Sequence, residues 1–184
     1  MLAAATLAGA VVRGPLAKPL ELAAMLPLAA SSLVLGTGLF LIVQPWIAAG
    51  RLALPVTALV NATLALPFVL RILLPNWRAI EADYGRLATS MGLIGIARWR
   101  WLILPRLRAS LGFSAGLVAA LSIGDLGVVA LFAGERGVTL PLLMQRLMGA
   151  YRMDAAAGVA LVLVSVSFAM FWLFDWEGRR HADA

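Results

Sequence analysis

The sequence contains no cysteine, one lysine and one histidine, and only 13% of its 184 residues are charged. Without cysteine the chain forms no disulfides and no thiolate metal sites, and it has no thiol nucleophile. A soluble domain carries roughly 25% charged residues, because its surface must be polar. With 62% hydrophobic residues this chain cannot cover such a surface. We therefore predict an all-α membrane protein, a bundle of several transmembrane helices.

Four long stretches contain no charged residue at all: 22–50, 52–70, 109–124 and 155–174. A helix needs about 20 mostly apolar residues to cross a hydrocarbon layer roughly 30 Å thick. At the N-terminus a positive charge, Arg13, follows the apolar stretch, whereas a secretory signal has its charge before it. We predict a single membrane domain over residues 1–184, with a partial span at 1–12 and further spans at 22–44, 54–74, 107–132 and 155–174.

The segment between the spans 54–74 and 107–132 has a different pattern. After Pro75-Asn76, apolar residues recur at intervals of three and four, which predicts one stripe on an amphipathic helix capped by Asn76 and closed by Gly92. The stripe consists of Trp77, Ile80, Tyr84, Leu87 and Met91.

Arginine positions predict the topology. Four arginines at 98, 100, 106 and 108 place residues 76–105 in the cytoplasm by the positive-inside rule. The C-terminus with Arg179 and Arg180 is then cytoplasmic as well, and residues 134–154 lie outside. Three arginines at 136, 146 and 152 count against this assignment. The interpretation that residues 76–105 are only a membrane anchor loop stays open at this point.

No motif for catalysis is present. The chain lacks a phosphate-binding glycine loop followed by Lys-Ser/Thr, paired histidines, and a Ser-His-Asp set beyond chance composition. The net charge of +6 is better explained by loops beside anionic lipid than by nucleic acid, because no basic stripe with interleaved aromatics is present. We expect neither enzymatic activity nor a metal or cofactor bound by this chain.

The cytoplasmic segment resembles that of the permease subunits of ABC importers. Their signature is Glu-Ala-Ala, three residues, Gly, nine residues, Ile, any residue and Leu-Pro. Gly92 followed by nine residues and Leu102-Ile103-Leu104-Pro105 has this spacing, with Leu102 in place of Ile. The Glu-Ala-Ala positions hold Arg86-Leu87-Ala88, of which only Ala88 matches, and Glu81-Ala82 lies five residues too early.

The resemblance continues downstream of this segment. The sequences from Ser122 to Gly127, from Thr139 to Pro141 and from Asp154 to Ala156 are similar to the second half of permeases for iron(III), sulfate, molybdate and thiamine. The similarity to the thiamine permeases is greatest. It implies a type I importer-like helical bundle, and it covers most of the second of two homologous halves, with an incomplete first span.

The family's mechanism implies specific roles and partners. The segment around Gly92 would be the coupling helix that docks on a cytoplasmic ABC ATPase, which itself binds the ATP and Mg. A periplasmic substrate-binding protein, a second permease half and the bilayer of the bacterial inner membrane would be the other partners. The implied coupling residues are Arg86, Leu87, Ala88, Gly92, Leu102, Leu104 and Pro105.

Asp125, between Gly124 and Gly127, is the one acid in a long apolar stretch. Ionisable groups at membrane depth are costly and usually face a cavity, so these three residues are candidates for the substrate pathway. Asp125 at the outer interface, satisfied by water, is the alternative. A cationic substrate such as thiamine would also suit aromatic residues, for which Phe132 and Tyr151 are candidates.

Two other classes of protein compete with an importer permease. A non-transporting membrane assembly protein stays open. A secondary transporter is disfavoured, because Asp125 alone breaks a span.

Overall fold

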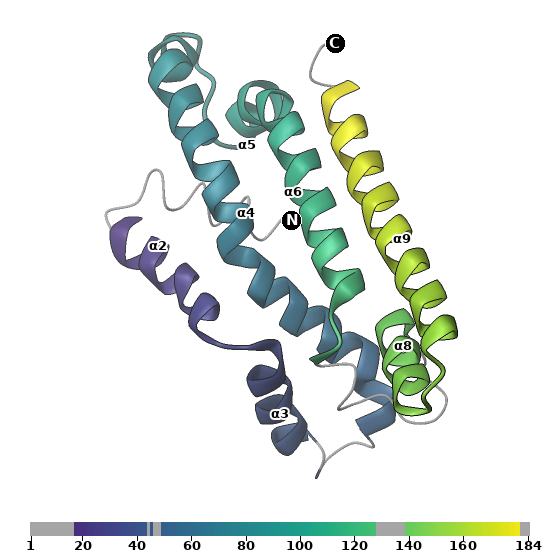
Figure 1. The fold of residues 1–184 in the computed structure, drawn as a ribbon. Coiled ribbons are helices and arrows are strands. Elements are labelled where there is room, and N and C mark those ends of the chain that lie inside the picture. Colours follow the sequence, from purple (N-terminus) through teal and green to yellow (C-terminus); the bar gives the residue numbers. More distant parts are fainter. Residues whose placement is uncertain (1–16, 44, 46–48, 128–138, 181–184) are drawn as a thin grey trace. The chain divides into compact units, whose positions relative to one another are not determined.

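The structure, a computed structural model, describes residues 17–43, 45, 49–127 and 139–180, and the regular secondary structure in these ranges is entirely helical (Figure 1). This confirms the all-α fold class. The chain divides into two compact units built from segments that are distant in sequence. Unit 1 comprises Met1–Met25, Leu66–Leu117 and Phe171–Ala184, and unit 2 comprises Leu26–Ala65 and Val118–Met170. Three of the four unit boundaries fall within the long helices α4, α6 and α9, and the fourth lies between α2 and η1.

Unit 1 combines one short N-terminal helix with parts of the three long helices. Its elements are α2 (Ala17–Met25), the C-terminal part of α4 (Ala49–Ser90), α5 (Gly95–Arg98), the π-helical segment η2 (Trp99–Ile103), the first part of α6 (Leu104–Gly124) and the end of α9 (Met153–Arg180). Arg78 of α4 donates to Glu21 of α2 at 2.7 Å. Helices α6 and α9 lie side by side, and Phe113 meets Phe171 edge to face at 5.4 Å between ring centroids (Figure 1).

Unit 2 contains the 3-10 helix η1 (Leu26–Ala29), α3 (Ser32–Val43), the start of α4, the end of α6, α8 (Leu140–Gly149) and the start of α9. Its buried centre includes Val56 and Val60 of α4. Apolar side chains of α3 and of the same α4 pack against these two, namely Leu35, Leu39, Phe40 and Leu64.

Helix α4 does not end at Pro75. The predicted span 54–74 and the predicted amphipathic helix after Asn76 form one continuous helix of 42 residues. Asn76 does not cap a new helix, because its side-chain amide donates to the carbonyl of Ile72, one turn earlier, at 2.8 Å. Leu74 and Trp77, on the two sides of Pro75, are both 2% exposed. The buried face therefore continues past the proline, and packing outweighs the one backbone hydrogen bond that proline cannot donate.

The predicted span 22–44 is not one continuous helix. Helix α2 is followed by η1, and the regular structure breaks at Ala30-Ser31 before α3 begins. The Ser31 hydroxyl accepts a hydrogen bond from the backbone N–H of Val34 at 3.3 Å, so Ser31 is the N-cap of α3. Pro27 supplies no N–H to the preceding turn, which favours the break.

Three helices in the described part of the chain are long and apolar enough to cross a membrane: Pro55–Ser90, Gly95–Gly124 and Met153–Arg180. A bent pair, Lys18–Ala29 with Ser32–Ile42, would add a fourth if it forms one span. On α9, Leu161 is 71% exposed and Phe168 is 70% exposed, which suits contact with lipid or with other membrane helices. The chain is a multi-pass membrane protein. The expected partial span 1–12 and residues 128–132 of the third expected span lie outside the described residues.

Candidate functional site

Helix α4 ends in a turn that needs a left-handed residue at position 92. The N–H of Leu93 donates to the carbonyl of Ala88 at 2.9 Å, and the N–H of Gly92 donates to the carbonyl of Thr89 at 3.1 Å. Gly92 has φ +69°, so this pair of bonds is a Schellman motif with Gly92 at the left-handed position. The predicted helix end at Gly92 is confirmed. A second left-handed glycine, Gly95 with φ +58°, begins α5.

The chain returns through α5, which has only four residues, and through the π-helical turn η2, which leads into α6. The N–H of Leu104 donates to the carbonyl of Trp99, five residues earlier. Pro105 follows directly. A proline ring clashes with the carbonyl four residues before it in a regular helix, and a widened turn relieves that clash. Leu102 and Ile103 are 7% and 1% exposed, so this end of the segment is anchored in the protein interior.

The predicted coupling residues separate into an anchoring group and an exposed group. Ala88 and Leu102 are buried, and Leu104 and Pro105 are half-buried. Arg86, Leu87 and Gly92 are exposed.

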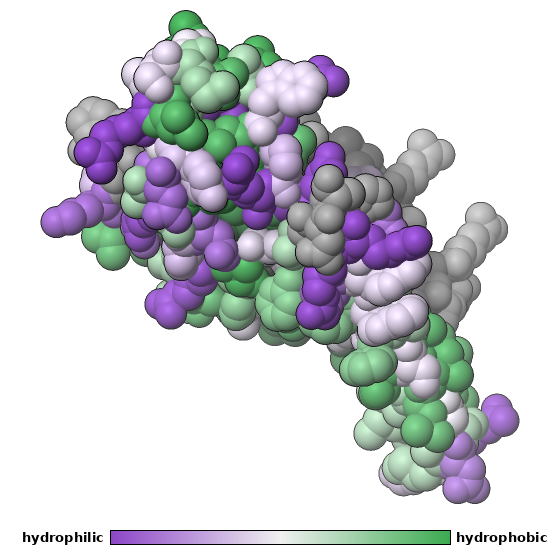
Figure 2. All heavy atoms as spheres, turned by 90° about the horizontal axis from the view of Figure 1, so that it is seen from above, coloured by the Kyte–Doolittle hydropathy of each residue, from purple (hydrophilic) through white to green (hydrophobic). Residues whose placement is uncertain are grey.

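The predicted apolar stripe is buried at its start and exposed at its end. Trp77 and Ile80 are buried, whereas Leu87 is 57% exposed and Met91 is 68% exposed. Ile94, Ile96 and Trp101 continue this exposed apolar tip around the turn. Figure 2 looks onto this end of the chain, where hydrophobic surface lies beside hydrophilic side chains. Large apolar side chains at a polar-rimmed surface are typical of a docking site.

Two residues outside the predicted set, Glu81 and Arg98, form an ion pair within this segment, with side chains 17% and 13% exposed. Nearby, the Arg106 guanidinium stacks on the Tyr84 ring at 4.2 Å from the centroid. The residues that surround Arg98 on α4 are Glu81, Gly85 and Thr89, spaced four apart. That spacing is the signal in the sequence that could have identified this pair.

The second candidate site surrounds Asp125 in unit 2. Helix α6 ends at Gly124, and the Asp125 carboxylate closes the following turn, with its Oδ1 accepting the N–H of Gly127 at 3.0 Å. The other oxygen, Oδ2, is buried and makes no hydrogen bond with any described residue. Helix α6 thus ends within the expected span 107–132. One carboxylate oxygen shapes the turn, and the other has no hydrogen-bond partner among the described residues.

Asp125 lines an open pocket of about 430 Å³, within the usual range for small-molecule sites. The other lining residues are Thr57, Ala58, Ser122, Ile123, Thr139, Leu140 and Pro141. Thr139 occupies the N-cap position of α8, but its side chain makes no cap hydrogen bond. Its Oγ1 is buried and has no partner among the described residues. The pocket thus contains two buried oxygens that have no hydrogen-bond partner in the described part of the chain.

Gly124 and Gly127, predicted together with Asp125, do not line this pocket. A side chain at position 127 would collide with the Ser32 hydroxyl at the start of α3, so Gly127 has a packing role within unit 2. Of the two predicted aromatic candidates, Phe132 lies outside the described residues. Tyr151 is 89% exposed and does not line the pocket. It occupies the left-handed position that ends α8, with φ 58°.

Comparison with known proteins gives no match to a family model and no match to a solved structure. The thiamine transport system permease protein ThiP of Salmonella typhimurium is 37% identical over 163 residues, which are 89% of this chain and 30% of that protein. Those of Escherichia coli and Brucella abortus are 35% and 34% identical over 85% and 83% of this chain, and 29% and 28% of those proteins. The sulfate permease CysW of Synechococcus elongatus is 28% identical over 62% of this chain and 41% of that protein.

These matches confirm the predicted resemblance to importer permeases, and most of them are to thiamine permeases. The chain spans about 30% of the length of the thiamine permeases that it matches.

Proposed function

Because the chain is homologous to thiamine transport system permeases over most of its length, we propose that it is a membrane-spanning part of an ATP-driven importer permease. It forms part of a path for thiamine or its phosphates through the membrane. The observation that carries the proposal is 34–37% identity to thiamine permeases over 83–89% of the chain. The three apolar helices and the turn at Gly92 support it independently.

The proposed partners follow from the predicted coupling segment. A cytoplasmic ABC ATPase docks on the exposed apolar tip around Met91, Ile94 and Ile96, and it carries the ATP and Mg. This chain hydrolyses no ATP and binds no cofactor. A periplasmic binding protein delivers substrate, and a second permease half completes the path. The chain lies in the bacterial inner membrane with its C-terminus in the cytoplasm, where Arg179 and Arg180 agree with the positive-inside rule.

The Asp125 pocket is the proposed contact with substrate. Thiamine carries a positive charge on its thiazolium ring, and a carboxylate oxygen that no described residue donates to is a favourable counter-charge. The Thr139 hydroxyl offers a further polar contact on the same pocket. The distant match to a sulfate permease supports the second candidate, an anion permease. The carboxylate of Asp125 in the pocket disfavours it, because like charges repel.

The test is uptake of labelled thiamine by the complete transporter, normalised to the amount of permease in the membrane. Asp125→Asn keeps the oxygen that accepts from the N–H of Gly127 and replaces the other oxygen with an NH2 group. The turn is therefore preserved while the charge is lost. We expect uptake to fall by about tenfold or more, which corresponds to ~1.4 kcal/mol. The control is Asp154→Asn, at an exposed carboxylate in the first turn of α9, which should transport normally.

Normal uptake by Asp125→Asn would assign Asp125 to the turn alone. Absence of thiamine uptake by the wild-type transporter, with sulfate transported in its place, would refute the proposed substrate. Failure of any ATPase to copurify with the wild type would favour a non-transporting assembly protein.

A further inference from the structure

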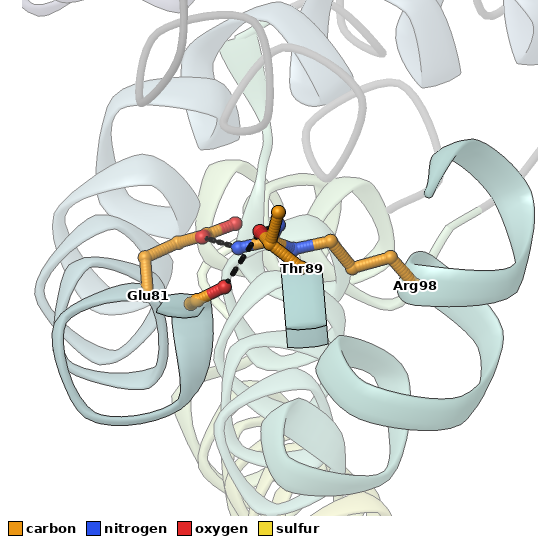
Figure 3. Close-up of polar contacts among 4 residues, drawn as sticks. Glu81, Thr89 and Arg98 are labelled. Carbon is orange, nitrogen blue, oxygen red and sulfur yellow. Dashed lines mark hydrogen bonds and ion pairs between the residues drawn. The ribbon is translucent and has the colours of Figure 1, made fainter. Parts of the chain in front are cut away.

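The Arg98 side chain lies in a shallow slot on the surface of α4 that is formed by Glu81, Gly85 and Thr89 (Figure 3). Its guanidinium pairs with the Glu81 carboxylate, and its Nη1 lies 3.5 Å from the Thr89 hydroxyl. The Thr89 hydroxyl donates to the carbonyl of Gly85 at 3.0 Å, so its lone pairs face the arginine as acceptors. Both members of the ion pair are more than four-fifths buried. Arg98 therefore differs from a lysine or arginine that only anchors a loop at lipid headgroups.

Gly85 makes the slot possible. Glu81, Gly85 and Thr89 are spaced by four residues, which places them on one face of α4. A Cβ atom at position 85 would lie 3.2 Å from Arg98 Nη2 and 3.3 Å from Glu81 Oε2, tighter than ordinary contact. The guanidinium thus passes over the helix where a side chain is missing.

The turn between α4 and α5, which Arg98 holds, has little other stabilisation. Between the end of α4 and Arg98 the backbone passes two left-handed glycines, Gly92 and Gly95, and a Cβ at either would have no atom within 4 Å. Helix α5 is the four-residue first turn of the helix Gly95–Gly124, and the ends of a helix fray. The ion pair with Glu81 connects α5 across this turn to the body of α4.

We propose that Arg98, held by Glu81 and Thr89 over Gly85, is a positioning residue that fixes the coupling segment rigidly to α4. This inference rests on the proposed function. The Glu-Ala-Ala acid of the family is replaced here by Arg86, which is exposed. The acid at position 81, one and a half turns earlier, instead fixes the orientation of α5 from within the permease. A displacement of the docked tip by the ATPase is then transmitted to α4 and is not absorbed by the turn at Gly92.

The experiment uses the complete transporter in lipid nanodiscs with its ATPase and binding protein. It measures three quantities: ATPase copurified per permease, the increase in ATP hydrolysis caused by loaded binding protein, and thiamine transported per ATP hydrolysed. The variants are Arg98→Gln, Glu81→Gln and Gly85→Ala. Gly85→Ala is the sharpest, because alanine favours the helix by intrinsic propensity and changes no charge, but it fills the slot.

We expect all three variants to retain the ATPase, because the exposed tip is unchanged. Stimulation and transport per ATP should fall by about fivefold or more, the lower end of measured coupling between sites. The controls are Asp83→Asn, an exposed charge on the same helix, and Gly158→Ala, where a Cβ meets no atom within 4 Å. Both should behave as wild type. In the permease alone, amide hydrogen exchange over residues 93–98 should be faster in Arg98→Gln than in Asp83→Asn.

Normal coupling in both Arg98→Gln and Gly85→Ala would overturn the positioning role. Loss of the ATPase in these variants, with normal stimulation of the fraction that remains bound, would also overturn it, because Arg98 would then serve docking. If the wild-type permease binds no ATPase, the proposed function fails, but faster exchange over residues 93–98 in Arg98→Gln would still show that Arg98 holds the turn.

Discussion

Helices α6 and α9 approach each other closely at Gly112 and Gly178 in unit 1, and one added methyl group tests this contact. In Gly112→Ala the new Cβ would lie 2.6 Å from the Cα of Gly178 and 2.6 Å from the carbonyl oxygen of Phe174. Both obstacles are backbone atoms, which cannot rotate away as a side chain can. Carbon atoms pack at about 3.5–4.0 Å, so the two helices must separate by about 1 Å.

The expected loss of stability follows from this separation. Overpacking of a close interface costs about 1–3 kcal/mol, and the edge-to-face contact of Phe113 with Phe171 contributes roughly 0.5–1.5 kcal/mol that separation weakens. Alanine returns up to about 1 kcal/mol through its higher helix propensity. We expect a net loss of about 1–3 kcal/mol. For a chain of this size each kcal/mol lowers Tm by about 2–4 °C, so Tm should fall by several degrees.

The assay is thermal unfolding of the detergent-solubilised complete protein, followed by loss of the monodisperse peak on size exclusion. Gly178→Ala approaches the same contact from α9, with its Cβ 2.7 Å from the Cα of Gly112, and should show a similar loss. The double variant should lose less than the two single losses added together, because the first methyl has already separated the helices. Gly158→Ala on α9 is the control and should unfold at or above the wild-type temperature. A Gly112→Ala protein as stable as Gly158→Ala would refute the close approach of the two helices.

Two further predictions concern the coupling segment and the topology. Gly92→Trp should abolish ATPase copurification while the permease remains inserted, because a bulky side chain at the exposed turn prevents docking. Gly92→Asn, which tolerates the left-handed conformation, should retain most of the bound ATPase, and equal binding by the Trp and Asn variants would contradict a docking role. For the topology, the chain has no cysteine, so single cysteines report on it cleanly. With a membrane-impermeant maleimide on intact cells, Tyr151→Cys should be labelled and Ser90→Cys only after permeabilisation, and the reverse pattern would contradict a cytoplasmic coupling segment.

Features that depend on composition or on a few neighbouring residues were predictable from the amino-acid sequence. The scarcity of charge and the long apolar runs specify membrane helices, because such a chain cannot form the polar surface of a soluble domain. The end of α4 at Gly92 and the end of α6 at Gly124 were predictable as well, since a left-handed glycine and an Asx turn act within one or two residues. The spacing from Gly92 to Pro105 predicts a coupling segment through its resemblance to the signature of importer permeases.

The tertiary structure decided whatever depends on contacts between segments distant in sequence. Pro75-Asn76 has the local chemistry of a helix boundary, but buried Leu74 and Trp77 hold one continuous helix through it. The pairing of Glu81 with Arg98, 17 residues apart, requires the turn to fold back over Gly85. The pocket that joins Asp125 to Thr139 exists only once α4, α6 and α8 have assembled. Each of these features depends on the position of another segment of the chain. Local helix propensity and the periodicity of hydrophobic residues contain no information about that position.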